Sequence, residues 1–189
     1  GLELLPWTPE LRQWQARVAL LRQLDLDQQG DSSWPDVSDG ALLKSLEHWL
    51  MPYLVRVSRL SHFANLDLSS IVHNLLPWPL PQRLDELAPH HLSVPSGSSI
   101  RLDYSEQPPI LAVRLQELFG LAETPRIAGG RQVVKLHLLS PARRPVQVID
   151  DAGEEREIFT GAANRRNTNL LVLMQGLDRR LGFPAGLAP

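Results

Sequence analysis

The residue types that most often carry out chemistry are few and scattered in this sequence. His90 and His91 are the only adjacent histidines, and neighbouring side chains on a strand point to opposite faces, so the two do not converge on one metal ion. The acidic pairs Asp85-Glu86 and Asp150-Asp151 could serve acid–base catalysis, but a helix-end charge and a loop charge explain them more simply. Cysteine is absent, which excludes disulfides, thiolate zinc sites and a thiol nucleophile. We therefore predict neither a metal site nor catalysis.

Motifs that bind nucleotides are also absent from the sequence. No glycine-rich loop is followed by Lys-Ser or Lys-Thr, and no Asp-Glu-x-His box occurs. Gly129-Gly130 lacks the spacing of a dinucleotide fingerprint, and there is no Gly-x-Ser-x-Gly elbow. We expect this chain to hold no ATP, Mg²⁺ or other cofactor and to have no enzymatic activity of its own.

Basic residues gather in the second half of the sequence, close to a few aromatic residues. Basic side chains beside a stacking ring are a usual means of holding a single nucleic-acid strand. The alternative is a set of solvated charges balanced by acidic neighbours, which fits the net charge of -2. For the segment around Arg114 a structural role, hydrogen bonding to loop backbone, is a further alternative. The candidate nucleic-acid residues are Arg101, Tyr104, Arg114, Arg131, Lys135, Arg143 and Arg144.

Tryptophan is confined to the first half of the sequence. Trp14 and Trp49 fall on apolar faces of predicted helices and are expected in the core. Trp7, Trp34 and Trp78 each neighbour a proline in a predicted loop. Large apolar groups at such positions are candidates for an interface with another protein surface.

Residue spacing predicts that the first half of the chain is helical. Thr8 can cap a helix and Pro9 suits its first turn. Apolar residues then recur at helical spacing to about Leu24, and Arg17 falls between them, where solvent is expected to reach it. Further helical stretches, interrupted by proline, continue to about Pro89.

Alternating polar and apolar residues replace the helical pattern in the second half. Ser96-Gly97 and Gly129-Gly130 each separate two such stretches and predict hairpins. The alternation over 132–139 predicts the strongest strand. The apolar spacing of 110–119 predicts one inserted helix, with Gly120 just beyond its end.

Length and composition are those of an ordinary globular protein of 189 residues, 43% of them hydrophobic. No apolar run approaches the roughly 20 residues of a membrane span, and no signal peptide is evident. We expect a cytoplasmic fragment of a longer protein. Its predicted fold is α+β, with a helical subdomain at 1–89, a small, mostly antiparallel sheet or barrel-like half with one inserted helix at 90–150, and a divergent tail at 151–189 that is partly helical or disordered.

Five stretches of unusual sequence occur between Pro6 and Ile149. They are Trp49-Leu50-x-Pro52, Leu84-Asp85-x-x-Ala88-Pro89, Val94-Pro95-Ser96-Gly97, Arg114-Leu115-Gln116-Glu117-Leu118-Phe119-Gly120 and Leu138-Leu139-Ser140-Pro141-Ala142-x-x-Pro145-Val146-Gln147-Val148. In content and order they resemble the C-terminal region of the HrpB family of bacterial DEAH-box, or DEAH/RHA-type, ATP-dependent helicases. Beyond Ile149 the chain departs from the aromatic, basic ending of that family and continues with the acidic segment 150–155, through divergence or a shifted reading frame.

The resemblance implies a non-catalytic accessory region joined to a helicase motor. ATP and Mg²⁺ would be bound only by motor domains upstream. The implied partners are the remainder of the helicase chain and a single strand of RNA, without membrane contact. The implied function is nucleic-acid guidance or docking to the motor, and the alternative is a structural or protein-interaction module that does not touch nucleic acid.

Overall fold

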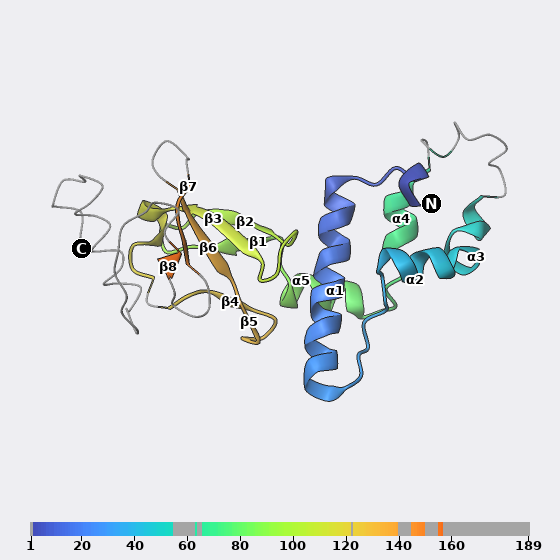
Figure 1. The fold of residues 1–189 in the computed structure, drawn as a ribbon, viewed down its shortest axis with the longest axis horizontal. Helices are drawn as coiled ribbons and strands as arrows, with labels where there is room; N and C mark the ends of the chain where they lie inside the picture. Colours follow the sequence, from blue (N-terminus) through green and yellow to red (C-terminus); the bar gives the residue numbers. More distant parts are fainter. Residues whose placement is uncertain are drawn as a thin grey trace. The chain divides into compact units, whose positions relative to one another are not determined.

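The computed structural model describes residues 2–54, 63, 66–121, 123–139, 145–149 and 155–156. The chain divides into two compact units, Gly1–Pro89 and His90–Pro189. The first contains the helices and the second contains a sheet, so the predicted α+β fold with a helical first half is confirmed (Figure 1). None of the helices among the described residues has the length and apolar character that crossing a membrane requires.

The longest element of the helical unit is α1, Pro9–Gln29. Thr8 Oγ1 accepts a hydrogen bond from the Leu11 N–H at 3.2 Å, which caps the first turn as the sequence predicts. At the other end Gly30 adopts a φ of 72° and donates its N–H to Leu26 O at 2.9 Å. The helix therefore continues past the predicted end near residue 24.

Shorter helices complete this unit, and α5 lies beside α1 (Figure 1). Trp14, Val18 and Leu21 of α1 point into the core, with 3%, 0% and 0% of their surface exposed. The other elements are the 3-10 turn η1 at Leu2–Leu4, α2 at Asp39–Lys44, α3 at Leu46–Trp49, the 3-10 turn η2 at Met51–Tyr53, α4 at Leu68–His73 and α5 at Leu80–Leu87.

Arg17 of α1 is buried, with 1% of its surface exposed, although the sequence predicts a solvated side chain. Its Nε donates to Ala88 O at 2.5 Å and its Nη2 lies 2.6 Å from Asp85 Oδ1. The prediction was wrong because carbonyl and carboxylate oxygens at the end of α5 replace the water that the guanidinium would otherwise need.

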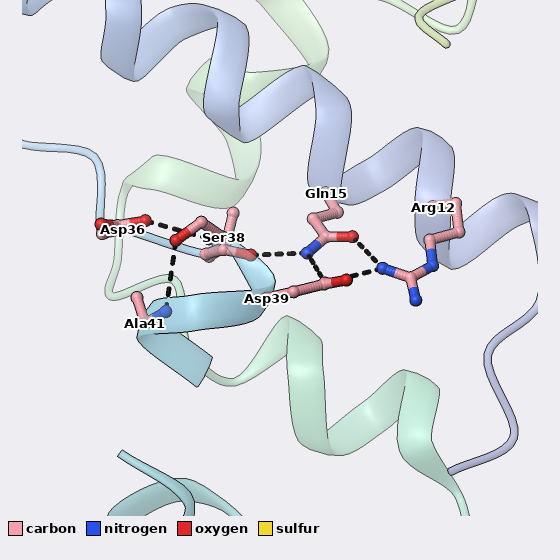
Figure 2. A network of polar contacts seen from close by, with 7 residues as sticks. Arg12, Gln15, Asp36, Ser38, Asp39 and Ala41 are labelled. Atoms are coloured by element: carbon pink, nitrogen blue, oxygen red, sulfur yellow. Dashed lines mark hydrogen bonds and ion pairs between the residues drawn. The ribbon is translucent and has the colours of Figure 1, made fainter. Parts of the chain in front are cut away.

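A second polar network joins α1 to the start of α2 (Figure 2). Arg12 Nη1 and Gln15 Nε2 both donate to Asp39 Oδ1, at 2.8 Å and 2.9 Å. Ser38 Oγ accepts from the Ala41 N–H at 3.2 Å and caps α2. These bonds hold the short helix α2 against α1.

The second unit is built on a six-stranded sheet of strand order β1-β2-β3-β6-β7-β8. Neighbouring strands are antiparallel except for β3 and β6, which are parallel, so the predicted mostly antiparallel sheet is confirmed. A separate two-stranded sheet is formed by β4 and β5. The strands are β1 at His91–Ser93, β2 at Ser99–Asp103, β3 at Ile110–Arg114, β4 at Arg126–Ile127, β5 at Gln132–Val133, β6 at Lys135–Leu139, β7 at Pro145–Ile149 and β8 at Glu155–Arg156.

Both predicted hairpins are confirmed. Ser96-Gly97 lies between β1 and β2, and Gly97 has a φ of 84°. Gly129-Gly130 lies between β4 and β5, with φ values of 66° and 87°. Positive φ is the conformation for which glycine is best suited, so these turns can be recognised from local sequence.

The predicted helix over 110–119 is wrong. Its first half is strand β3, which pairs with β2 on one side and β6 on the other, and only Leu115–Leu118 forms a single 3-10 turn, η4. The strand predicted over 132–139 is divided between two sheets: the Val134 N–H donates to Pro125 O at 2.9 Å, in register with the β4–β5 pairing, whereas the Lys135 N–H donates to Pro109 O at 2.8 Å and begins the pairing with β3. Within the predicted tail β8 is a short strand, and the other residues of 151–189 lie outside the described part.

Candidate nucleic-acid interface

The register of the sheet assigns its side chains to two faces. Leu102 pairs with Leu111, and Leu111 pairs with Leu136. All three are at most 1% exposed and form the core of this unit. On each strand, the residues directly before and after these core residues point to the opposite side of the sheet, which we call the polar face. On β2, β3 and β6 its members are Ser99, Arg101, Asp103, Ile110, Ala112, Arg114, Lys135, His137 and Leu139.

Three of the predicted nucleic-acid residues share the polar face. Arg101 is exposed on β2, whereas Arg114 at the end of β3 and Lys135 at the start of β6 are half-buried. Lys135 Nζ lies 3.7 Å from Glu106 Oε2. Within the described ranges neither Arg101 nor Arg114 forms an ion pair, although Asp103 shares the face with Arg101 and the Glu117 carboxylate lies beside the Arg114 backbone.

The other predicted nucleic-acid residues lie elsewhere. Tyr104 is 4% exposed, on the core side of the sheet, so its ring is not available for base stacking and this expectation is corrected. Arg131 lies in the turn between β4 and β5, where its Nε donates to Ala128 O at 2.9 Å. Arg143 and Arg144 fall outside the described residues.

Histidine is a component of the polar face that the sequence prediction omitted. His137 on β6 pairs with Ala112 of β3, and His91 on β1 pairs with Arg101. Burial lowers the pKa of His137 from 6.5, and the charge of Lys135 lowers it further, while Glu106 and Asp103 act in the opposite direction. The neutral imidazole is thus favoured. In the sequence, His137 falls on the polar side of the alternating polar and apolar residues 135–139, and this signal could have identified it.

Glu117 has a structural role in the segment that follows β3. Its carboxylate Oε2 accepts a hydrogen bond from the Arg114 N–H at 3.1 Å, and its carbonyl accepts from the Ser96 N–H at 3.3 Å. The bond from Ser96 joins the Arg114–Gly120 stretch to the Val94–Gly97 stretch. The structural explanation of this segment therefore applies to Glu117 and the backbone.

The three candidate interface tryptophans differ in exposure. Trp78 is 78% exposed between two prolines, as an interface residue should be. Trp7 is half-buried, with the Arg12 guanidinium carbon 4.2 Å from its ring centroid. Trp34 is 1% exposed, so its ring belongs to the core and the expectation of a surface position is corrected. The backbone of this loop is held to α1, because Arg22 Nη1 donates to Trp34 O at 2.6 Å.

The turn η2 is an exposed apolar surface that the sequence prediction missed. Met51 is 56% exposed and Tyr53 is 47% exposed. Tyr53 is tied to the end of α4, because Asn74 Nδ2 donates to its hydroxyl at 3.3 Å. In the same part of the sequence Trp49 and Leu50 are buried, so this stretch contributes both to the core and to the surface.

Among the residues that the structure describes, no three His, Asp or Glu side chains come together in a group that could hold a metal ion. The polar face carries three cationic side chains and the imidazole of His137 beside the carboxylate of Asp103, and its cationic groups suit anions.

Comparison with known proteins identifies the family. A family model described as ATP-dependent helicase C-terminal, HrpB_C, matches residues 49–154. The ATP-dependent RNA helicase HrpB of Escherichia coli (strain K12) is 42% identical over 155 residues, which are 82% of this chain and 19% of the relative. The chain thus spans about a fifth of the length of this curated relative.

Solved structures of helicases agree with this assignment. A crystal structure of the E. coli DExH-box NTPase HrpB matches 100% of this chain and 22% of its own, with a TM-score of 0.77 and 36% identity. A crystal structure of the Escherichia coli DEAH/RHA helicase HrpB matches 83% of this chain and 19% of its own, with a TM-score of 0.65 and 39% identity. The resemblance found in the sequence is confirmed, and the chain belongs to the HrpB family as a C-terminal region of these ATP-dependent helicases.

Proposed function

We propose that this chain is an accessory region that guides a single RNA strand for the helicase to which it is joined. The observation that carries the proposal is the sharing of the polar face by Arg101, Arg114 and Lys135. Cationic side chains on one face of a sheet neutralise phosphates and release counterions, which gives affinity without reading the base sequence. A local basic face can do this even though the chain as a whole has a net charge of -2.

In this proposal the chain binds and does not catalyse. Hydrolysis of ATP is assigned to the part of the helicase that corresponds to the remaining four-fifths of the relatives. RNA rather than DNA is chosen because the E. coli relative is named an RNA helicase. Contacts from the polar face would hold a strand near the motor and reduce its dissociation between steps.

Salt dependence of binding tests this function. The purified chain is titrated into fluorescein-labelled single-stranded RNA, and anisotropy is measured at several salt concentrations. Two or three phosphate contacts give a slope of log K against log salt of about -1.4 to -2.1. Absence of binding at low salt by a chain with a native circular dichroism spectrum would exclude RNA guidance.

A second candidate function, docking onto the rest of the helicase, is favoured by Trp78, which is 78% exposed. Exposed tryptophans often supply much of the energy of an interface, commonly about 2 kcal/mol or more each. The change Trp78→Ser in the complete helicase should then lower its melting temperature while the isolated chain keeps its own. Equal melting temperatures of the complete wild-type and variant proteins would argue against docking at Trp78.

A further inference from the structure

Ala112 lies at the centre of the polar face, and it is exposed. It pairs with His137 on β6. On the other side, the recorded β2–β3 pairing ends at Leu102 and Leu111, and extending this register by one residue places Arg101 across from Ala112. Two residues further along β3, Arg114 lies on the same face. Arg101, Arg114 and His137 therefore lie around a residue that has no side chain beyond its Cβ, with Ile110 completing the row along β3.

Sheet geometry sets the scale of this arrangement. Adjacent strands are about 4.8 Å apart, and alternate residues on one strand are about 7 Å apart. Arginine side chains are long enough to reach over Ala112 from either neighbouring position. A phosphate group offers several acceptor oxygens and can be held by more than one guanidinium or imidazole donor at once.

We propose that Arg101, Ala112, Arg114 and His137 form a binding site, the Ala112 site, for one phosphodiester group of a single-stranded nucleic acid. This rests on the proposed function and names the group that the polar face recognises. Arg101 and Arg114 donate charged hydrogen bonds to the phosphate oxygens. His137 supplies an N–H from its neutral ring, and Ala112 leaves the surface above the strand free.

Charges around the site also give the strand a direction. Two residues before Ala112 on β3, Ile110 pairs with Asp103 of β2 on one side and with Lys135 of β6 on the other. Lys135 Nζ lies 3.7 Å from Glu106 Oε2. Two carboxylates and only one ammonium group, that of Lys135, therefore border this end of the polar face, so it attracts a phosphate chain less than the Arg114 end does. The strand leaves Ala112 toward Arg114 and away from Glu106.

Substitution of Ala112 is the first test, with anisotropy of labelled single-stranded RNA as the measurement. Ala112→Glu places a negative charge and three more heavy atoms along its chain at the centre of the site, and we expect binding to weaken by about tenfold or more. Ser33→Glu changes the net charge equally at an exposed position of the helical unit and should bind within about twofold of wild type. If Ala112→Glu does not fold, Ala112→Thr, which suits a strand, should still weaken binding severalfold.

Substitution of arginine is the second test. Arg101→Gln should lower the magnitude of the salt slope by about 0.7, the value for one lost phosphate contact with a single strand. Arg83→Gln removes the same charge from an exposed position on α5 and should leave the slope unchanged. Single-stranded DNA of the same base sequence should bind about as well as RNA, since both contain the phosphodiester group.

The outcomes separate the two proposals. If wild type binds RNA and folded Ala112 and Arg101 variants bind equally well with equal slopes, the Ala112 site is overturned and RNA guidance stands. A preference for RNA over DNA above about tenfold would place recognition at the 2′-hydroxyl and also overturn the phosphate site. If wild type binds neither strand at low salt, both proposals are overturned.

Discussion

Arg17 and Asp85 join the first and last helices of the helical unit, with Arg17 Nη2 2.6 Å from Asp85 Oδ1. The two partners differ in environment, because the side chain of Arg17 is 1% exposed and that of Asp85 is 70% exposed. Arg17 also donates from Nη2 to Leu84 O at 3.3 Å and from Nε to Ala88 O at 2.5 Å. The arginine thus satisfies carbonyl groups at the end of α5, while the carboxylate remains in contact with water.

Loss of Arg17 should therefore destabilise the helical unit far more than loss of its partner. Arg17→Ala removes the donor to Ala88 O and one of the two donors to Leu84 O, which still accepts the Ala88 N–H, and it opens a cavity. We therefore expect the free energy of unfolding to fall by about 3 kcal/mol or more. Asp85→Asn should cost about 1 kcal/mol or less, since solvent screens an exposed carboxylate. Urea denaturation measures both. Equal losses would show that the ion pair, not the backbone bonding, stabilises this contact.

The Asp39 network should contribute a modest, pH-dependent stabilisation. Its hydrogen bond from Gln15, with a smaller effect of Arg12, lowers the pKa of Asp39 below 3.8. A carboxyl pKa that is lower in the folded state stabilises the fold at every pH above the pKa of the unfolded state. This stabilisation is lost as the pH falls through the pKa of the folded state. Asp39→Ala should cost about 1 kcal/mol or less at pH 7 and make the unit less sensitive to pH below 4. Thermal denaturation between pH 7 and 2.5 tests this, and an unchanged acid transition would contradict it.

His137 should make the stability of the sheet unit fall in mildly acidic solution. Burial lowers its folded pKa from 6.5, so the unfolded chain takes up a proton first as pH decreases. The stabilising effect of the neutral ring is complete above about pH 6.5, and it is lost as the pH falls through the pKa of His137 in the folded state. His137→Gln should remove this part of the pH dependence. Urea midpoints at pH 7.5 and 5.5 measure it, and the same decrease in both proteins would exclude His137 as its source.

Gly120 and Gly40 should respond to alanine in opposite directions. Gly120 has a φ of +89°, and an added Cβ would lie 3.9 Å from Pro95 Cβ, an ordinary contact. The cost of Gly120→Ala therefore comes from the backbone and should be about 1–2 kcal/mol. Gly40 in α2 lacks a positive φ and has nothing within 4 Å of an added Cβ, so Gly40→Ala should stabilise by about 0.5–1 kcal/mol. Differential scanning calorimetry should show a lower melting temperature for Gly120→Ala and a higher one for Gly40→Ala.

Local signals allowed several elements to be predicted from sequence. The Thr8 cap and the turns at Gly97 and Gly129-Gly130 depend on residues within a few positions of one another. By contrast, leucines at 111, 115 and 118 have helical spacing, yet Ile110 pairs with Lys135 in a parallel ladder. A helix and a buried strand can carry the same short apolar pattern, and only the distant partner strand decides between them.

By itself, the sequence determined the family resemblance, the absence of nucleotide-binding motifs and the basic residues available to bind an anion. Tertiary structure decided where each charge lies. Arg17 is buried because acceptors 67 to 71 residues away in the chain replace its water, whereas Arg101 and Arg114 keep their charge on the polar face. Strand register, which no local pattern contains, brings them together around Ala112. Burial of a charge depends on which distant groups fold against it, and spacing along one helix or strand cannot report that.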